Sequence, residues 1–74
     1  MMDLQSFTDS LKYSKIEASG NNWWEISNIE YGNLGSLIKR TQRWFLLPDN
    51  NVYSWHELTH KPPTWFKPDP NMPL

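Results

Sequence analysis

Five of the six prolines in this 74-residue chain lie in the segment after Lys61. Proline lacks the backbone N–H that a helix interior or a central strand needs, so we expect no regular secondary structure in this segment. The sequence therefore predicts one small domain over residues 1–61 and an extended, proline-rich tail over residues 62–74. A domain of this size buries a modest share of its surface and has limited stability.

The first segment has the hydrophobic spacing of a helix. Leu4, Phe7 and Leu11 recur at i, i+3 and i+7 and form one apolar stripe within residues 3–16. Asp3 is a suitable N-cap for this helix, because a short acidic side chain can accept from the first free backbone N–H groups.

Residues 23–30 (WWEISNIE) alternate as a half-buried strand would, with Trp24 and Ile26 on one face. The glycines of YGNLG favour a turn, and so does PDNN further on. We also expect a tight reversal near Arg40–Gln42, within a polar run, and a short strand end at VYS. The three predicted strands cover residues 23–30, 36–42 and 43–47.

A second helix is predicted from Trp55 to about Lys61. Ser54 and Glu57 form the S-x-x-E pattern of a capping box, and Pro62 ends the helix. The predicted fold class is therefore α+β, with an N-terminal helix, a three-stranded antiparallel meander, a short C-terminal helix and an extended tail.

The segment HELTH, residues 56–60, resembles the HExxH motif of zinc metalloproteases. The resemblance implies that His56 and His60 bind Zn²⁺ and that Glu57 activates a water molecule. Pro62 shortens the helix, however, and Phe66 stands where one branch of that family has its third ligand. We therefore expect no metal or other cofactor, and a site formed by His56 and His60 is kept as an alternative.

The sequence contains no nucleophile motif, no phosphate-binding glycine loop and no cysteine, so we expect a protein that is not an enzyme. Its net charge of −1 is not typical of a nucleic-acid-binding protein. Nucleic-acid binding is nevertheless an alternative function, because basic residues cluster beside Trp44. The residues assigned to this alternative are Lys39, Arg40, Arg43 and Lys61.

The segment from residue 48 to residue 65 also resembles the DNA-binding end of H-NS-type nucleoid proteins. In this chain HELTH stands where that family has a Gly-x-Gly-Arg loop. The similar order of residues comprises Pro48, Asn50, Trp55, Lys61, Pro63 and Trp65.

Aromatic residues make up 15% of the chain, and five of them are tryptophan. Trp and Tyr are common at the centres of protein interfaces, so we predict a small binding module whose partner is another protein. We expect an inhibitor or accessory protein of phage or mobile-element origin. The candidate partner-binding residues are Trp65, Phe66, Trp23 and Tyr53. For Trp65 and Phe66 the alternative is that they fold back onto the sheet.

The N-terminal segment has neither the basic start nor the apolar run of a signal peptide. No stretch has the length of a membrane span. Together with the absence of cysteine, these features lead us to expect a cytoplasmic protein without membrane contact.

Overall fold

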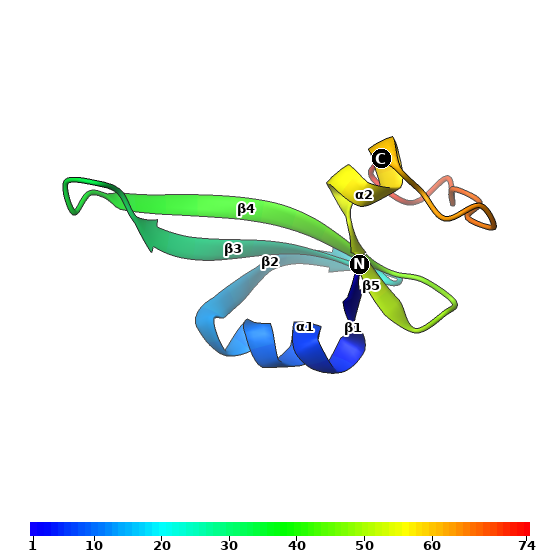
Figure 1. The fold of residues 1–74 in the computed structure, drawn as a ribbon, viewed down its shortest axis with the longest axis horizontal. Coiled ribbons are helices and arrows are strands. Elements are labelled where there is room, and N and C mark those ends of the chain that lie inside the picture. Colours follow the sequence, from blue (N-terminus) through cyan, green and yellow to red (C-terminus); the bar gives the residue numbers. More distant parts are fainter.

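The computed structural model describes residues 1–74 and consists mainly of one five-stranded antiparallel sheet (Figure 1). The strand order is β1-β5-β4-β3-β2. The predicted fold class is wrong, because the sheet has five strands instead of three and the two helices are short. The elements are β1 (Met2–Asp3), α1 (Leu4–Ser10), the 3₁₀ helix η1 (Leu11–Tyr13), β2 (Ser14–Gly20), β3 (Trp23–Tyr31), β4 (Leu37–Leu46), β5 (Asn51–Ser54) and α2 (Trp55–His60). Neither α-helix has the length and apolar character needed to cross a membrane.

The N-terminal helix begins where the sequence predicts but ends earlier. The carboxylate of Asp3 accepts from the backbone N–H of Ser6 at 2.7 Å, which confirms the N-cap. The helix ends at Ser10 instead of continuing to residue 16. One 3₁₀ turn, η1, follows, and β2 begins at Ser14. Strand β2 pairs with β3 and places Ile16 opposite Ile26. Pairing with a neighbouring strand therefore outweighs the weak helical pattern of this segment.

Strand β4 is continuous over ten residues, so the predicted reversal near Arg40–Gln42 is wrong. Its polar middle pairs with β3 without interruption, for example with Arg40 opposite Asn28 and Gln42 opposite Ile26. No glycine or proline interrupts this run, and exposed strand positions accept polar side chains on both faces.

The same type of loop closes the two hairpins on either side of β4. In the β3–β4 hairpin, the N–H of Gly32 donates to the carbonyl of Ser36 at 2.7 Å, and Gly35 has a positive φ of 77°. In the β4–β5 hairpin, the N–H of Leu47 donates to the carbonyl of Asn51 at 3.0 Å, and Asn50 has a φ of 65°. Both loops therefore place Gly or Asn at the left-handed position, as three-residue hairpin loops require.

The sheet is covered on both faces near the end where β5 lies, with α1 on one face and α2 with the tail on the other (Figure 1). On the α1 face, Phe7, Ile26 and Val52 form a buried cluster against which Trp24 and Trp44 pack. On the α2 face the buried cluster comprises Phe45, Leu47, Tyr53 and Leu58. Successive residues of a strand point to opposite faces, which is why neighbours such as Trp44 and Phe45 belong to different clusters.

Candidate functional site

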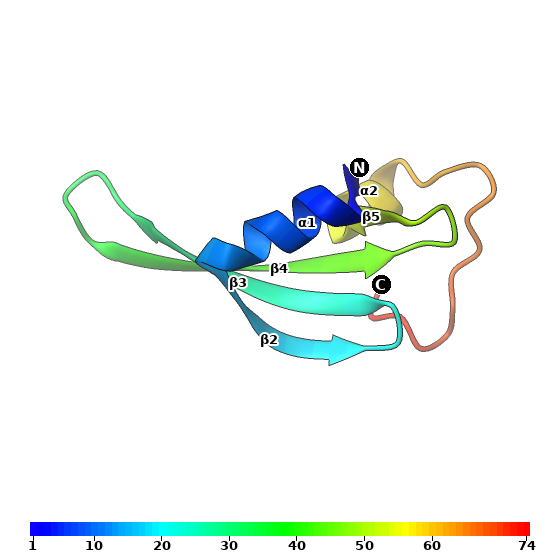
Figure 2. The same ribbon diagram turned by 90° about the horizontal axis from the view of Figure 1, so that it is seen from below.

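The β3–β4 hairpin projects from the body of the protein as an arm, which we define as residues 29–40 (Figures 1 and 2). It contributes to the elongated shape of the molecule, whose principal extents are 43, 23 and 20 Å. Apart from Gly32, every residue of the arm is exposed, because neither helix reaches this part of the sheet. The backbone of the arm is therefore paired only within the β3–β4 ladder.

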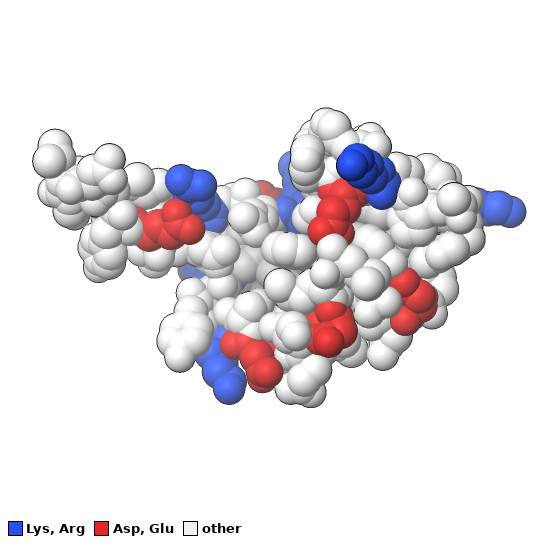
Figure 3. All heavy atoms as spheres, viewed as in Figure 1, with Lys and Arg blue, Asp and Glu red and all other residues white.

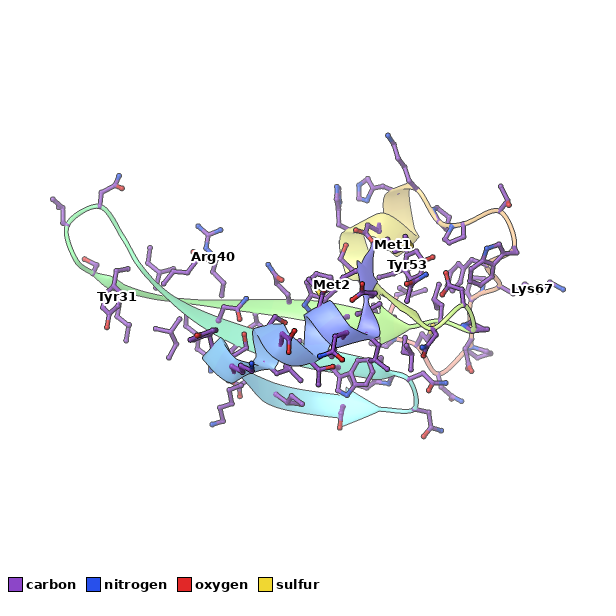
Figure 4. The ribbon with its side chains drawn as sticks, turned by 60° about the horizontal axis from the view of Figure 1, so that its bottom comes forward. Met1, Met2, Tyr31, Arg40, Tyr53 and Lys67 are labelled. Atoms are coloured by element: carbon purple, nitrogen blue, oxygen red, sulfur yellow. The ribbon has the colours of Figure 1, made fainter.

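Apolar side chains are concentrated on the arm, although they have no core to enter. Tyr31 and Leu37 form a cross-strand pair, and Leu34 lies in the loop at the end of the arm. The end of the arm carries no charged side chains in the view of Figure 3, and Figure 4 shows Tyr31 and Arg40 pointing to opposite sides of the ribbon. The exposed fractions are 62% for Ile29, 76% for Tyr31, 96% for Leu34, 65% for Leu37 and 38% for Ile38.

Two of the basic residues on β4 are paired with acidic residues of the same sheet. The Lys39 ammonium lies 2.7 Å from a Glu17 carboxylate oxygen, and Arg40 lies 2.9 Å from Glu30. The Lys39 contact and a hydrogen bond from the Ser27 hydroxyl lower the pKa of Glu17 from its ordinary value of 4.5. These cations stand within a strand, so their expected position at a hairpin reversal is wrong.

The third basic residue of β4, Arg43, forms no ion pair within 4 Å, and its side chain donates one hydrogen bond, to the carbonyl of Pro73 at 3.4 Å. It lies opposite Glu25 in the β3–β4 ladder. Lys61, the remaining residue of the nucleic-acid alternative, is the C-cap of α2. The structure therefore places Lys61 on a different element from the cluster on β4.

A cavity of about 690 Å³ lies where β5 separates from β4. One wall is formed by β4, and the other is the junction of β5 and α2. Residues from both faces of β4 take part, so the cavity follows the edge of the strand and not one face of the sheet. The lining residues are Glu25, Thr41, Gln42, Arg43, Trp44, Ser54, Trp55 and His56.

The residues of the HELTH segment are engaged in the structure of α2 itself. Ser54 and Glu57 form the predicted capping box, with the Glu57 N–H donating to the Ser54 hydroxyl at 3.1 Å. The rings of His56 and His60 lie 4.1 Å apart, and Nδ1 of His60 lies 3.1 Å from the carbonyl oxygen of His56. No group of three or more His, Cys, Asp or Glu residues is arranged to hold a metal ion.

The two aromatic residues of the tail have different environments. Phe66 is half-buried and packs against the cluster on the α2 face, together with Met72. Trp65 is 48% exposed and lines a second cavity, of about 550 Å³, beside Leu46 and Leu47. Phe66 lines this cavity as well, so the two side chains lie close together and differ in how deeply they are buried.

The other two candidate partner-binding residues lie in the body of the sheet. Trp23 packs on the α2-face cluster, and its indole covers Gly20, where an added Cβ would lie 2.0 Å from the indole nitrogen. Tyr53 is buried and its hydroxyl donates to Asp49. This hydrogen bond raises the pKa of Tyr53 to about 12 and lowers that of Asp49 below its ordinary value.

Comparisons with protein family models, with curated proteins and with solved structures find no match for this chain. Any function assigned to this protein must therefore be argued from the geometry of its own residues. The apolar arm was not among the residues assigned from the sequence. A signal for it exists, because apolar residues stand on both sides of the YGNLG turn: Ile29 and Tyr31 alternate with polar residues before it, and Leu37 and Ile38 are adjacent after it.

Proposed function

We propose that this protein is a non-enzymatic module that binds another protein through the apolar arm. The observation that supports this proposal is the group of exposed apolar side chains on a projecting hairpin. Contiguous apolar surface on a small protein commonly marks an interaction site, because leaving it in water is unfavourable. A narrow, convex arm is suited to an apolar groove on a folded partner.

The proposed effect of binding is that the module covers a functional surface of its partner, as an inhibitor or accessory protein of phage or mobile-element origin. A cytoplasmic setting is part of this proposal, since a chain without cysteine needs no oxidising compartment to fold. Aromatic and aliphatic side chains such as Tyr31 and Leu34 supply contact area, and the β3–β4 ladder limits the loss of backbone entropy on binding.

Nucleic-acid binding has less support from the arrangement of charges. Of the three basic residues on β4, Lys39 and Arg40 form ion pairs with Glu17 and Glu30, and only Arg43 forms no ion pair. Binding to phosphates would have to break these pairs, and it would weaken steeply as salt increases. A gel-shift titration against duplex DNA at two salt concentrations tests this alternative directly.

The proposed function is tested with the double variant Ile29→Thr/Tyr31→Thr, which changes two exposed positions of β3. Threonine keeps the strand propensity of both positions while it removes most of their apolar surface. A partner captured from the native host is purified and mixed with each protein, and the affinities are measured. We expect the arm variant to lose binding while its melting temperature stays close to that of the natural protein.

The matched control is Tyr13→Thr, which removes an aromatic ring that is 87% exposed on η1, outside the arm. We expect this variant to bind as the natural protein does. Equal binding by the arm variant and the natural protein would exclude the arm as the interface.

A further inference from the structure

Strand β4 has a partner on one side only over most of its length. On the β5 side, the ladder contains the pairs Trp44–Ser54, Phe45–Tyr53 and Leu46–Val52. It ends at Ser54, which is the N-cap of α2. Residues Leu37–Arg43 pair with β3 but have no strand on their other side. We call this stretch the open edge; Figure 2 shows that β4 continues well past β5.

Alternating residues of an antiparallel strand direct their N–H and C=O groups away from the existing partner. The open edge therefore offers a row of unpaired backbone groups, which can accept an added strand. The cavity of about 690 Å³ lies at the start of this row, directly where a continuation of β5 would run. It provides room for a side chain of the added strand between Trp44 and Trp55.

A second copy of this chain is a poor occupant of the open edge. A two-fold axis normal to the sheet lies between the two β4 strands, midway between one residue and the same residue of the second copy, so one residue must pair with itself. We consider the registers in which at least five of the seven residues of the open edge pair with the second copy. Each of these registers places two basic residues opposite each other. The opposed residues are Lys39 with Lys39, Arg40 with Arg40, or Lys39 with Arg43, and like charges in directly opposite positions destabilise a sheet.

Of these charges, that of Arg43 favours an acidic occupant, because Lys39 and Arg40 already form ion pairs. The open edge carries three basic residues and no acidic one. Arg43 shares the cavity wall with Glu25, which lies opposite it in the ladder, but the two form no ion pair within 4 Å. A carboxylate on an added strand could therefore form a charge-assisted hydrogen bond with the Arg43 guanidinium.

We propose that the open edge of β4 binds an extended, acidic segment of a partner polypeptide as an additional strand. One acidic side chain of this segment meets Arg43, and a neighbouring apolar side chain enters the cavity between Trp44 and Trp55. This inference rests on the proposed protein-binding function, and it adds a second contact that recognises the backbone and charge of the partner. The open edge shares residues 37–40 with the apolar arm, whereas the cavity and Arg43 lie outside the arm.

The first experiment selects peptides from a random linear peptide library, displayed on yeast, against the full-length protein. We expect the selected peptides to share an acidic residue next to an apolar one, and to bind the Arg43→Gln variant about tenfold more weakly. The matched control is Lys67→Gln, which removes a cation from the tail at a distance from the open edge, and should leave binding unchanged. Selection of no peptides, or of peptides without acidic preference, would overturn the proposal.

The second experiment distinguishes strand addition from side-chain binding. The strongest selected peptide is synthesised in two forms, each N-methylated on one of the two alternating sets of amides. An added strand directs only one set towards β4, so one form should lose about tenfold or more in affinity and the other should retain it. Amide hydrogen exchange should slow within residues 37–43. Equal affinities of the two forms, or slowing only elsewhere, would overturn the proposal.

The two proposals fail in different ways. The arm variant Ile29→Thr/Tyr31→Thr changes β3 only and leaves the open edge intact. If it loses the natural partner but no peptide binds at the open edge, only the strand-addition proposal is wrong. If peptides bind at the open edge while the arm variant keeps its partner, the proposed role of the arm is wrong.

Discussion

Ser54 lies directly opposite Trp44 in the last cross-strand pair of β4 and β5, and its hydroxyl also caps α2. One residue therefore ends a strand and begins a helix. This change of direction takes the chain away from β4 and leaves the open edge and its cavity beside Trp44.

The capping role of Ser54 predicts the effect of its replacement. Ser54→Ala removes the acceptor for the Glu57 N–H and should lower the free energy of unfolding by about 1 kcal/mol. Denaturant unfolding followed by tryptophan fluorescence measures this change. Ser54→Asp retains an acceptor at the same position and serves as the control, so an equal loss of stability in both variants would contradict the capping explanation.

Both faces of the sheet should be essential for stability. Phe7 on the α1 face and Phe45 on the α2 face are 2% and 0% exposed, so replacing either with Ala should cost about 3–5 kcal/mol. This is a large share of the stability of a small domain, and both variants should be partly unfolded at room temperature. Tyr13→Ala, at an exposed position, should change stability by less than about 0.5 kcal/mol. Full folding of either core variant in a thermal melt would show that its cluster contributes little.

The two aromatic residues of the tail should differ in their effect on stability. Phe66→Ala removes a half-buried ring from the α2-face cluster and should cost about 1–2 kcal/mol, whereas Trp65→Ala should cost less. Truncation after Lys61 should cost more than Phe66→Ala, because it also removes Met72. These differences are measured by chemical denaturation. A larger loss from Trp65→Ala than from Phe66→Ala would contradict the observed packing.

The hydrogen bond between Tyr53 and Asp49 predicts two pH windows. The pKa of Tyr53 is raised from 10.0 to about 12, so its contribution to stability is complete below pH 10.0 and is lost as the pH rises towards 12. The pKa of Asp49 is lowered from 3.8, so its contribution is complete above pH 3.8 and is lost as the pH falls through the lowered value. Denaturant midpoints across pH should show both losses.

Tyr53→Phe is the control for this pair, because it removes the hydrogen bond and preserves the ring. Its stability should change less between pH 10 and pH 12 than that of the natural protein. A variant with the same alkaline profile as the natural protein would assign the change to another group.

Little of the candidate site could be predicted from the sequence. Trp23 and Tyr53 were selected for residue type, and Trp65 and Phe66 also for their place after the double proline. Among the four, only Trp65 is exposed, by 48%. The open edge depends on where β5 leaves β4, which no pattern within β4 itself indicates. The exposure of Tyr31 and Leu37 likewise depends on the absence of a covering helix.

The sequence by itself determined the features that depend on neighbouring residues. These features are the Asp3 cap, the capping box at Ser54 and the turns at YGNLG and PDNN. Each is formed by residues a few positions apart in the chain, so the residue types at those positions are sufficient to predict it. Only the tertiary structure decided that Ser14–Gly20 forms a strand and that β4 is continuous. The reason is physical: a strand is stabilised by hydrogen bonds and side-chain contacts with another strand, so its existence depends on residues distant in the sequence.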